Sequence, residues 1–181
     1  MTSFWVGKRV RLRGIEPGDA PAFMRFAAEE EGLGDLVNPP RSAEGHRIRA
    51  GEGAAAKPDG DRFQLVVEAV DTGETVGAVG SHQADARMGW FEYGITIGAE
   101  HRRKGYAAEA AVLLLRFMFQ ESRYHKCQVR IFAHNDASLA LHRQLGFTEE
   151  SRLREQVYLA GRYRDVVMMG MLADEFARQH A

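Results

Sequence analysis

The stretch Gly94-Ile-Thr-Ile-Gly-Ala-Glu-His-Arg-Arg-Lys-Gly-Tyr-Ala107 is the most informative part of this chain. Its first residues predict the end of a strand, its middle a basic loop, and its end the start of a long apolar helix. Amides of a loop that leads into a helix point toward one spot, where the helix dipole adds about half a positive charge. Gly105 allows close approach because it lacks a Cβ, and Arg102, Arg103 and Lys104 add positive charge. The sequence therefore predicts a phosphate or pyrophosphate site at this turn.

The glycine and the basic residues of this turn do not fit the two commonest phosphate-binding patterns. They form neither a Walker A loop, G-x-x-x-x-G-K-[ST], nor a Rossmann G-x-G-x-x-G. The turn instead resembles the acyl-CoA loop of the GNAT superfamily of N-acetyltransferases, R/Q-x-x-G-x-G/A, matched here as Arg102-x-x-Gly105-x-Ala107. The alternative is an ordinary first helical turn with exposed basic side chains.

A second segment, Asn135-Asp-Ala-Ser-Leu-Ala-Leu-His-Arg-Gln-Leu-Gly-Phe147, follows the next predicted strand. It resembles the second GNAT signature, N-x-x-S/A-x-x-L-Y-x-x-x-G-F. The resemblance implies that Asn135 contacts the pantetheine arm of the cofactor. Asn135 is also a good helix N-cap and Gly146 a good C-cap, so a purely structural role is the alternative.

A third segment, residues 155–168, looks like the closing hairpin of the RimJ/RimL-type acetyltransferases and of related small-molecule enzymes. RimJ/RimL-type enzymes modify the N-termini of ribosomal proteins. The usual Asn-Gly turn is Ala160-Gly161 here, which is a mild departure. The three segments occur in the family's order and cover roughly the C-terminal half of the chain, whereas the first 60 residues resemble the family only loosely.

Length, charge and composition limit the number of domains and the kinds of partner that the chain can have. The chain has 181 residues, a net charge of -1 and one cysteine, Cys127. These values predict a single domain without disulfides, and they disfavour a nucleic-acid-binding surface. The resemblance implies that this domain, over residues 1–181, is an N-acetyltransferase domain. The absence of a signal peptide or a membrane span predicts a cytoplasmic protein that does not bind a membrane. The scattered histidines indicate no metal site.

The order of predicted elements favours a mixed, mostly antiparallel α/β sheet flanked by helices, the α+β arrangement of a single-domain acyl-CoA N-acyltransferase fold. Periodicity and breakers predict strands at 9–13, 63–70, 74–82, 90–97, 126–133, 147–158 and 163–172, helices at 20–28, 42–56, 106–120 and 135–145, and loops at 29–40, 83–87 and 101–105.

The resemblance implies that acetyl-CoA donates its acetyl group directly to an amine in a ternary complex, without an acetyl-enzyme. The strand that holds residues 94–97 would splay from the strand at 129–133, and the pantetheine arm would lie in the gap. The implied cofactor site comprises Ile95, Ile97, Arg102, Arg103, Lys104, Gly105, Tyr106, Ala107, Asn135 and Ser138.

Three residues are candidates for the proton transfers. Glu92 is the candidate base, because it lies two residues before Gly94, near a position where many family members keep a glutamate; an exposed strand carboxylate is the alternative. Ser138 or His142 would protonate the leaving thiolate. Capping of the helix is the alternative role for Ser138, and a solvated helix face is the alternative position of His142. His82, expected at a strand end, and Tyr163 are further candidates for lining the acceptor pocket.

The acceptor stays open at this point. It is either a peptide or protein N-terminus or a small amine, and a non-catalytic acyl-CoA-binding module is the alternative from another class. The resemblance is compatible with a homodimer.

Overall fold

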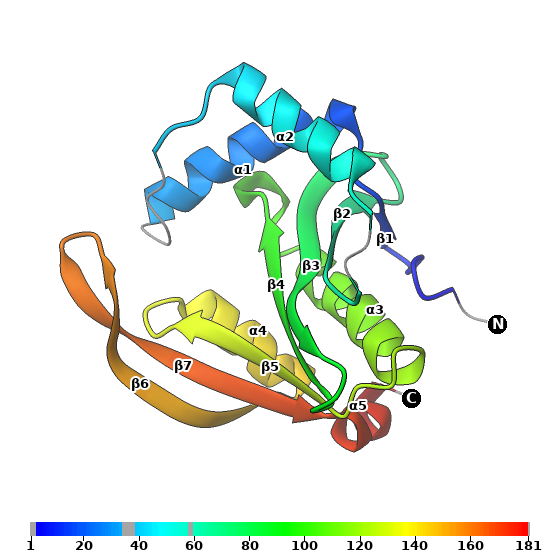
Figure 1. Cartoon of the computed structure of the whole chain (residues 1–181), viewed down its shortest axis with the longest axis vertical. Coiled ribbons are helices and arrows are strands. Elements are labelled where there is room, and N and C mark those ends of the chain that lie inside the picture. The colour runs from blue at the N-terminus through cyan, green and yellow to red at the C-terminus, as the bar shows by residue number, and fades with distance from the viewer. Residues whose placement is uncertain (1–2, 34–38, 58–59, 181) are drawn as a thin grey trace.

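The computed structural model describes residues 3–33, 39–57 and 60–180. One seven-stranded sheet with the order β1-β2-β3-β4-β5-β7-β6 forms its centre (Figure 1). Only β4 and β5 are parallel neighbours, which confirms the mixed, mostly antiparallel sheet. The strands are β1 (Val10–Arg13), β2 (Phe63–Ala69), β3 (Thr75–Asp85), β4 (Trp90–Ile97), β5 (Lys126–Phe132), β6 (Thr148–Leu159) and β7 (Arg162–Leu172).

Helices lie on both sides of this sheet. In Figure 1, α1 and α2 lie together across one end of β3 and β4, and α3 runs along the other side of β1 to β4. The helices are α1 (Ala20–Leu33), α2 (Ala43–Ala55), α3 (Tyr106–Gln120), α4 (Asp136–Leu145) and α5 (Ala173–His180), with short 3-10 helices η1 (Pro17–Asp19) and η2 (Ala99–His101).

Helix α3 supplies most of the contact between the helices and the sheet. It buries seven apolar side chains, which confirms the expectation of a helix with little polar surface: Ala110, Ala111, Leu113, Leu114, Leu115, Met118 and Phe119. Full burial of one leucine-sized side chain stabilises a fold by about 1.5–3 kcal/mol. This packing places α3 against β1 to β4, and the first turn of the helix lies beside the segment that precedes β1.

Several predicted boundaries were wrong. Helix α1 continues to Leu33 into the expected loop at 29–40, of which residues 34–38 lie outside the described part of the chain. Strand β3 continues through Gln83 to Asp85, because these polar residues pair with β4. Helix α5 was not predicted; it buries only Phe176, which is too little to give a clear periodic pattern.

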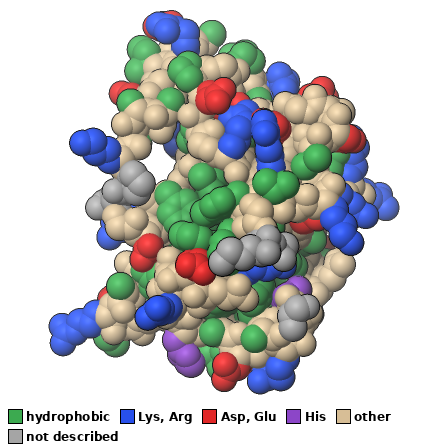
Figure 2. Space-filling view, turned by 90° about the vertical axis from the view of Figure 1, so that its right-hand side faces the viewer, with side chains coloured by type: hydrophobic (Ala, Val, Ile, Leu, Met, Phe, Trp, Pro, Cys, Tyr) green, Lys and Arg blue, Asp and Glu red, His purple; other side chains and the backbone are tan. Residues whose placement is uncertain are grey.

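Charge on the surface is mixed, as the net charge of -1 suggests. On the face in Figure 2, lysine and arginine side chains are scattered among acidic and apolar ones. None of the helices in the described part of the chain has the length and hydrophobicity of a membrane-spanning segment.

Candidate active site

The central feature of the site is the point at which β4 and β5 separate. The two strands pair at only three positions, Trp90 with Lys126, Phe91 with Cys127, and Glu92 with Gln128. Beyond Glu92, β4 stays paired with β3 and β5 with β7, so the two halves of the sheet diverge (Figure 1). The predicted splay between these strands is therefore present.

The backbone of Ile95 and Ile97 is directed toward this divergence. Gly98 N–H donates to Val76 C=O on β3, and alternate residues of an antiparallel strand turn their backbone groups to opposite sides. Ile95 and Ile97 consequently present theirs to the side that β5 has left. The Ile97 carbonyl accepts a bond of 3.1 Å from Arg102 Nε, which folds the basic loop back onto the strand.

The loop after β4 has the form that the sequence predicted. Gly105 has φ of 80°, in the left-handed region, and no side chain caps the helix that begins after it. The first amides of α3 are thus left for a ligand. Arg102, Arg103 and Lys104 are exposed beside them.

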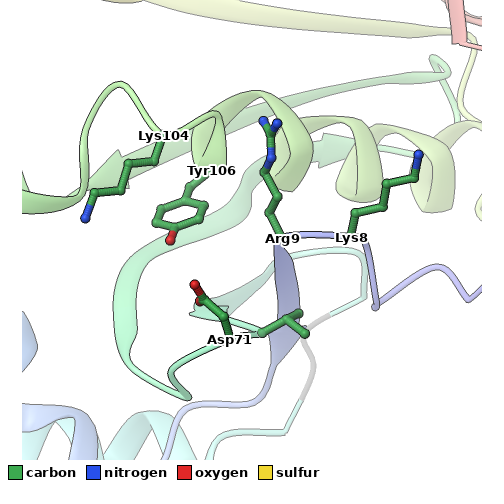
Figure 3. Close-up of a pocket in the computed structure, with 6 residues that line it drawn as sticks. Lys8, Arg9, Asp71, Lys104 and Tyr106 are labelled. Atoms are coloured by element: carbon green, nitrogen blue, oxygen red, sulfur yellow. The ribbon is translucent and has the colours of Figure 1, made fainter.

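Two basic residues that the sequence analysis did not select also lie at this turn. Lys8 and Arg9 precede β1, and together with Lys104, Tyr106, Val70 and Asp71 they line a cavity of about 280 Å³ (Figure 3). The Arg9 guanidinium lies directly against Gly105, so that a Cβ at this glycine would collide with it. No local pattern could have revealed this contact, because the two residues are far apart in the chain.

Glu109, in the first turn of α3, positions this basic segment. Its carboxylate accepts bonds of 2.9, 2.7 and 2.8 Å from the backbone N–H groups of Lys8, Arg9 and Val10. Glu109 therefore binds the segment around the start of β1 and leaves the first backbone N–H groups of its own helix unoccupied.

Glu92 is half-buried at the last position where β4 pairs with β5. Burial raises the pKa of its carboxyl; Arg130 on β5 lowers it by a smaller amount, and the pKa lies above its ordinary value. Alternation along β4 directs Glu92 and Gly94 to one face of the sheet and Tyr93 to the other.

His82 contacts Gly94 on the Glu92 face of the sheet. A Cβ built on Gly94 would lie 3.0 Å from Cδ2 of the His82 ring and closer still to Nε2. The expectation that His82 ends a strand was wrong, because β3 continues for three more residues. Burial lowers the pKa of His82.

On the opposite face, Tyr93 and His142 form a buried pair. The Tyr93 hydroxyl lies 2.9 Å from His142 Nε2, and His142 Nδ1 lies 2.8 Å from the Ser138 carbonyl oxygen. A carbonyl oxygen can only accept, so Nδ1 carries the proton and Nε2 accepts from Tyr93. Burial lowers the pKa of His142 and raises that of Tyr93. The alternative of a solvated His142 was wrong, since this residue is 3% exposed.

Asn135 and Ser138 lie at the N-terminus of α4. Asn135 Oδ1 accepts a bond of 3.0 Å from Ser138 N–H, which confirms Asn135 as the N-cap, and Gly146 ends the helix with φ of 96°. The Ser138 hydroxyl lies 3.4 Å from His142 Nδ1, so it receives at most a weak bond from that ring.

The remaining candidates do not extend this arrangement. Tyr163 packs edge-to-face on Tyr158 across the β6–β7 hairpin with a centroid distance of 5.1 Å, and both rings are exposed. Within the part of the chain that the structure describes, no three histidine, cysteine or acidic side chains are grouped as metal ligands would be.

Comparison with known proteins places this arrangement in a family. A model of the acetyltransferase (GNAT) domain matches residues 9–148. YokL, an uncharacterized N-acetyltransferase from the SPbeta prophage of Bacillus subtilis, is 31% identical over 178 residues, 98% of either chain. A spermidine N(1)-acetyltransferase of Vibrio cholerae is 32% identical over 85 residues, 47% of this chain and 49% of that protein.

Solved structures agree in fold. Spermidine N-acetyltransferase from Vibrio cholerae, in complex with CoA and spermine, superimposes with a TM-score of 0.81 at 23% identity, over 94% of this chain and 99% of that one. Because the family model covers most of the chain and YokL aligns along nearly all of it, the chain belongs to the GNAT family of acetyl-CoA-dependent N-acetyltransferases.

Proposed function

We propose that this enzyme, as one domain over residues 1–181, transfers the acetyl group of acetyl-CoA to a primary amine by direct attack in a ternary complex. The observation that carries the proposal is the separation of β4 and β5 beside Glu92. A thioester in this gap would have Glu92 near one face of the sheet and Ser138 near the other.

The donor would extend from the gap to the start of α3. Backbone groups of Ile95 and Ile97 would bind the pantetheine arm, and one of these amides would polarise the thioester carbonyl as an oxyanion-hole donor. The uncapped amides after Gly105 would hold the pyrophosphate. The proposed cofactor site comprises Ile95, Ile97, Arg102, Arg103, Lys104, Gly105, Tyr106, Ala107, Asn135 and Ser138, and Lys8 and Arg9 extend its positive charge.

Glu92 would act as the general base. An alkyl ammonium with a pKa of about 10.4 must lose a proton before its nitrogen can attack. The raised pKa of Glu92 supports this role, because a half-buried carboxylate is a better proton acceptor than one in water.

Ser138 would protonate the departing thiolate, and His142 would position it. Both ring nitrogens of His142 are engaged, one with the Ser138 carbonyl and one with Tyr93. The Ser138 hydroxyl keeps its own proton to donate, and the residue is partly exposed, so water can restore that proton.

A small cationic amine is the acceptor that we favour. The half-buried carboxylate of Glu92 would attract such an amine, and the Vibrio cholerae relative is a spermidine N(1)-acetyltransferase. A peptide N-terminus is the second candidate, because residues 155–168 lie in the β6–β7 hairpin and resemble in sequence the closing hairpin of RimJ/RimL-type enzymes.

Release of free CoA tests the reaction and the acceptor together. The enzyme with acetyl-CoA should release CoA with spermidine or another small amine, and more slowly with peptides. A preference for peptides would reverse the choice of acceptor. Acetyl-CoA binding without CoA release across both amine sets would favour a non-catalytic binding module.

Substitution of Glu92 tests the base. Glu92→Gln should lower kcat about 100-fold or more without changing acetyl-CoA affinity, since general base catalysis typically contributes about 10²–10⁴-fold. Glu74→Gln, in an exposed turn between β2 and β3, is the matched control and should be neutral. Full activity of Glu92→Gln would remove Glu92 as the base.

A further inference from the structure

The reaction requires two protons to leave the acceptor nitrogen. R–NH₃⁺ and acetyl-S-CoA give R–NH–CO–CH₃, CoA-SH and one free proton. One nitrogen proton must leave before attack, and a second must leave after the N–C bond has formed. Glu92 is a single carboxylate and accounts for only one of them. This inference rests on the proposed function.

His82 lies where a second acceptor would be needed. The pairing of β3 with β4 shifts between Ser81, opposite Tyr93, and Gln83, opposite Glu92. His82 is the extra residue at this shift, which makes it the bulged position of β3. Bulges re-aim side chains, and this one brings the imidazole over the Cα of Gly94.

Gly94 makes room for the ring at this position. Any larger residue would place a Cβ against Nε2 of His82. Gly94 also follows Glu92, the last residue of β4 that pairs with β5, so the ring lies at the start of the divergence from β5. His82 and Glu92 thus occupy the same face of the sheet at the same point.

The surroundings of His82 suit a proton acceptor. The part of the ring that packs against the sheet is shielded from water, which lowers the pKa of His82 from its ordinary value of about 6.5 and favours the neutral imidazole at pH 7. Glu92 of β4 shares this face with His82, and Arg130 of β5 lies close enough to Glu92 to lower its pKa. His82 itself is exposed, whereas Glu92 is half-buried, so His82 has the shorter path to solvent.

We propose that His82 is a second catalytic residue that accepts the proton lost from nitrogen after attack. Glu92 takes the first proton from the ammonium, and the free amine attacks the thioester carbon. As the tetrahedral adduct collapses, the C–S bond breaks, the second nitrogen proton passes to the His82 imidazole, and the thiolate takes a proton from Ser138. The imidazolium and the Glu92 carboxyl then release their protons to solvent, and water returns one proton to Ser138, which leaves the one free proton of the overall reaction.

Replacement of His82 by glutamine tests this role in the whole enzyme. His82→Gln should lower kcat about 10- to 100-fold, within the range for loss of one acid–base group, with an unchanged KM for acetyl-CoA. In the wild type kcat should fall as pH drops through the His82 pKa below 6.5. His82→Gln should lack this limb and keep only the limb set by protonation of Glu92. His125→Gln, which removes an exposed histidine before β5, is the matched control.

Two further variants keep the proposal falsifiable if His82→Gln is poorly folded. Imidazole added to His82→Ala should restore part of kcat, which a purely structural role would not allow. When His82 is present, Gly94→Ala should displace the ring and lower kcat. The same change made in His82→Gln should lower kcat much less. If the wild type releases CoA with amines while His82→Gln keeps its full kcat and pH profile, His82 is not an acceptor. If the wild type itself releases no CoA with amines, the proposed acetyl transfer is contradicted, and the role of His82 falls with it.

Discussion

The N-termini of α3 and α4 differ in whether a side chain binds their first backbone N–H groups. Each helix follows a central strand of the sheet, α3 after β4 and α4 after β5. At α4, Asn135 caps the helix through a bond to Ser138 N–H. At α3, Gly105 provides no side chain, and the first-turn acid Glu109 binds the segment before β1 instead.

This difference separates a helix terminus whose first amides are open to a ligand from one that is closed by its own cap. The first amides of α3 keep their hydrogen-bonding capacity and their positive dipole end, beside Arg9 and Lys104. The amide of Ser138 in α4 is already satisfied, and what that turn offers to a ligand is the Ser138 hydroxyl. We therefore expect changes at α3 to alter donor binding and changes at α4 to alter turnover or stability.

Gly105→Glu should have the largest effect. It places a side chain at φ of 80°, against Arg9, and adds a negative charge where the pyrophosphate would bind. Calorimetry should show acetyl-CoA affinity reduced about 100-fold or more, which corresponds to about 2.7 kcal/mol. Gly161→Glu is the control, because Gly161 has φ of 79° and open space around it. Equal affinity in the two variants would contradict the loop assignment.

Ser138→Ala should have the next largest effect, on turnover. Loss of the hydroxyl should lower kcat about 10- to 100-fold, while the Asn135 cap survives because it uses the backbone N–H of residue 138. Steady-state kinetics with a known amine measures this. Ser138→Thr keeps a hydroxyl and should retain most of the activity; an equal loss in both variants would indicate a steric role.

Arg9→Ala should weaken donor binding moderately. An exposed ionic contact contributes up to about 1 kcal/mol, so we expect the Kd for acetyl-CoA to rise about fivefold at low salt and less at high salt. Arg49→Ala on α2 removes the same charge elsewhere and should leave the Kd unchanged. A salt-independent change in Arg9→Ala would mean that Arg9 only supports the shape of the loop.

Asn135→Ala should have the smallest effect if this residue is only a cap. The free energy of unfolding should fall by about 1 kcal/mol, measured by urea denaturation, and Asn135→Asp should restore it. The family resemblance adds a contact with the pantetheine arm, which predicts a higher KM for acetyl-CoA in both variants. An unchanged KM would leave Asn135 with the structural role alone.

Local features were predictable because neighbouring residues decide them. Asn135 caps α4, Gly146 ends that helix and α3 begins directly after Gly105, as expected, since each of these depends on backbone geometry within a few residues. Polar Gln83 was assigned wrongly to a loop because its strand conformation depends on pairing with β4.

The partners inside the candidate site could not be predicted in this way. The Tyr93 hydroxyl bonds to His142, 49 positions away in the chain. Because this bond occupies His142 Nε2, the hydroxyl of Ser138 is left as the proton donor of the two candidates. Arg9 reaches Gly105 because Glu109 holds the segment before β1. Neither contact leaves a periodic or motif signal.

By itself, the sequence determined the family, the donor and the order of the main elements up to the last strand, because the basic loop at 102–107 and the capped helix at 135–146 are chemical patterns of adjacent residues. Only the tertiary structure decided which side chains meet at the point where β4 leaves β5. Strand register and a single bulge in β3 bring His82 over Gly94, and a one-residue shift would turn that ring to the other face of the sheet.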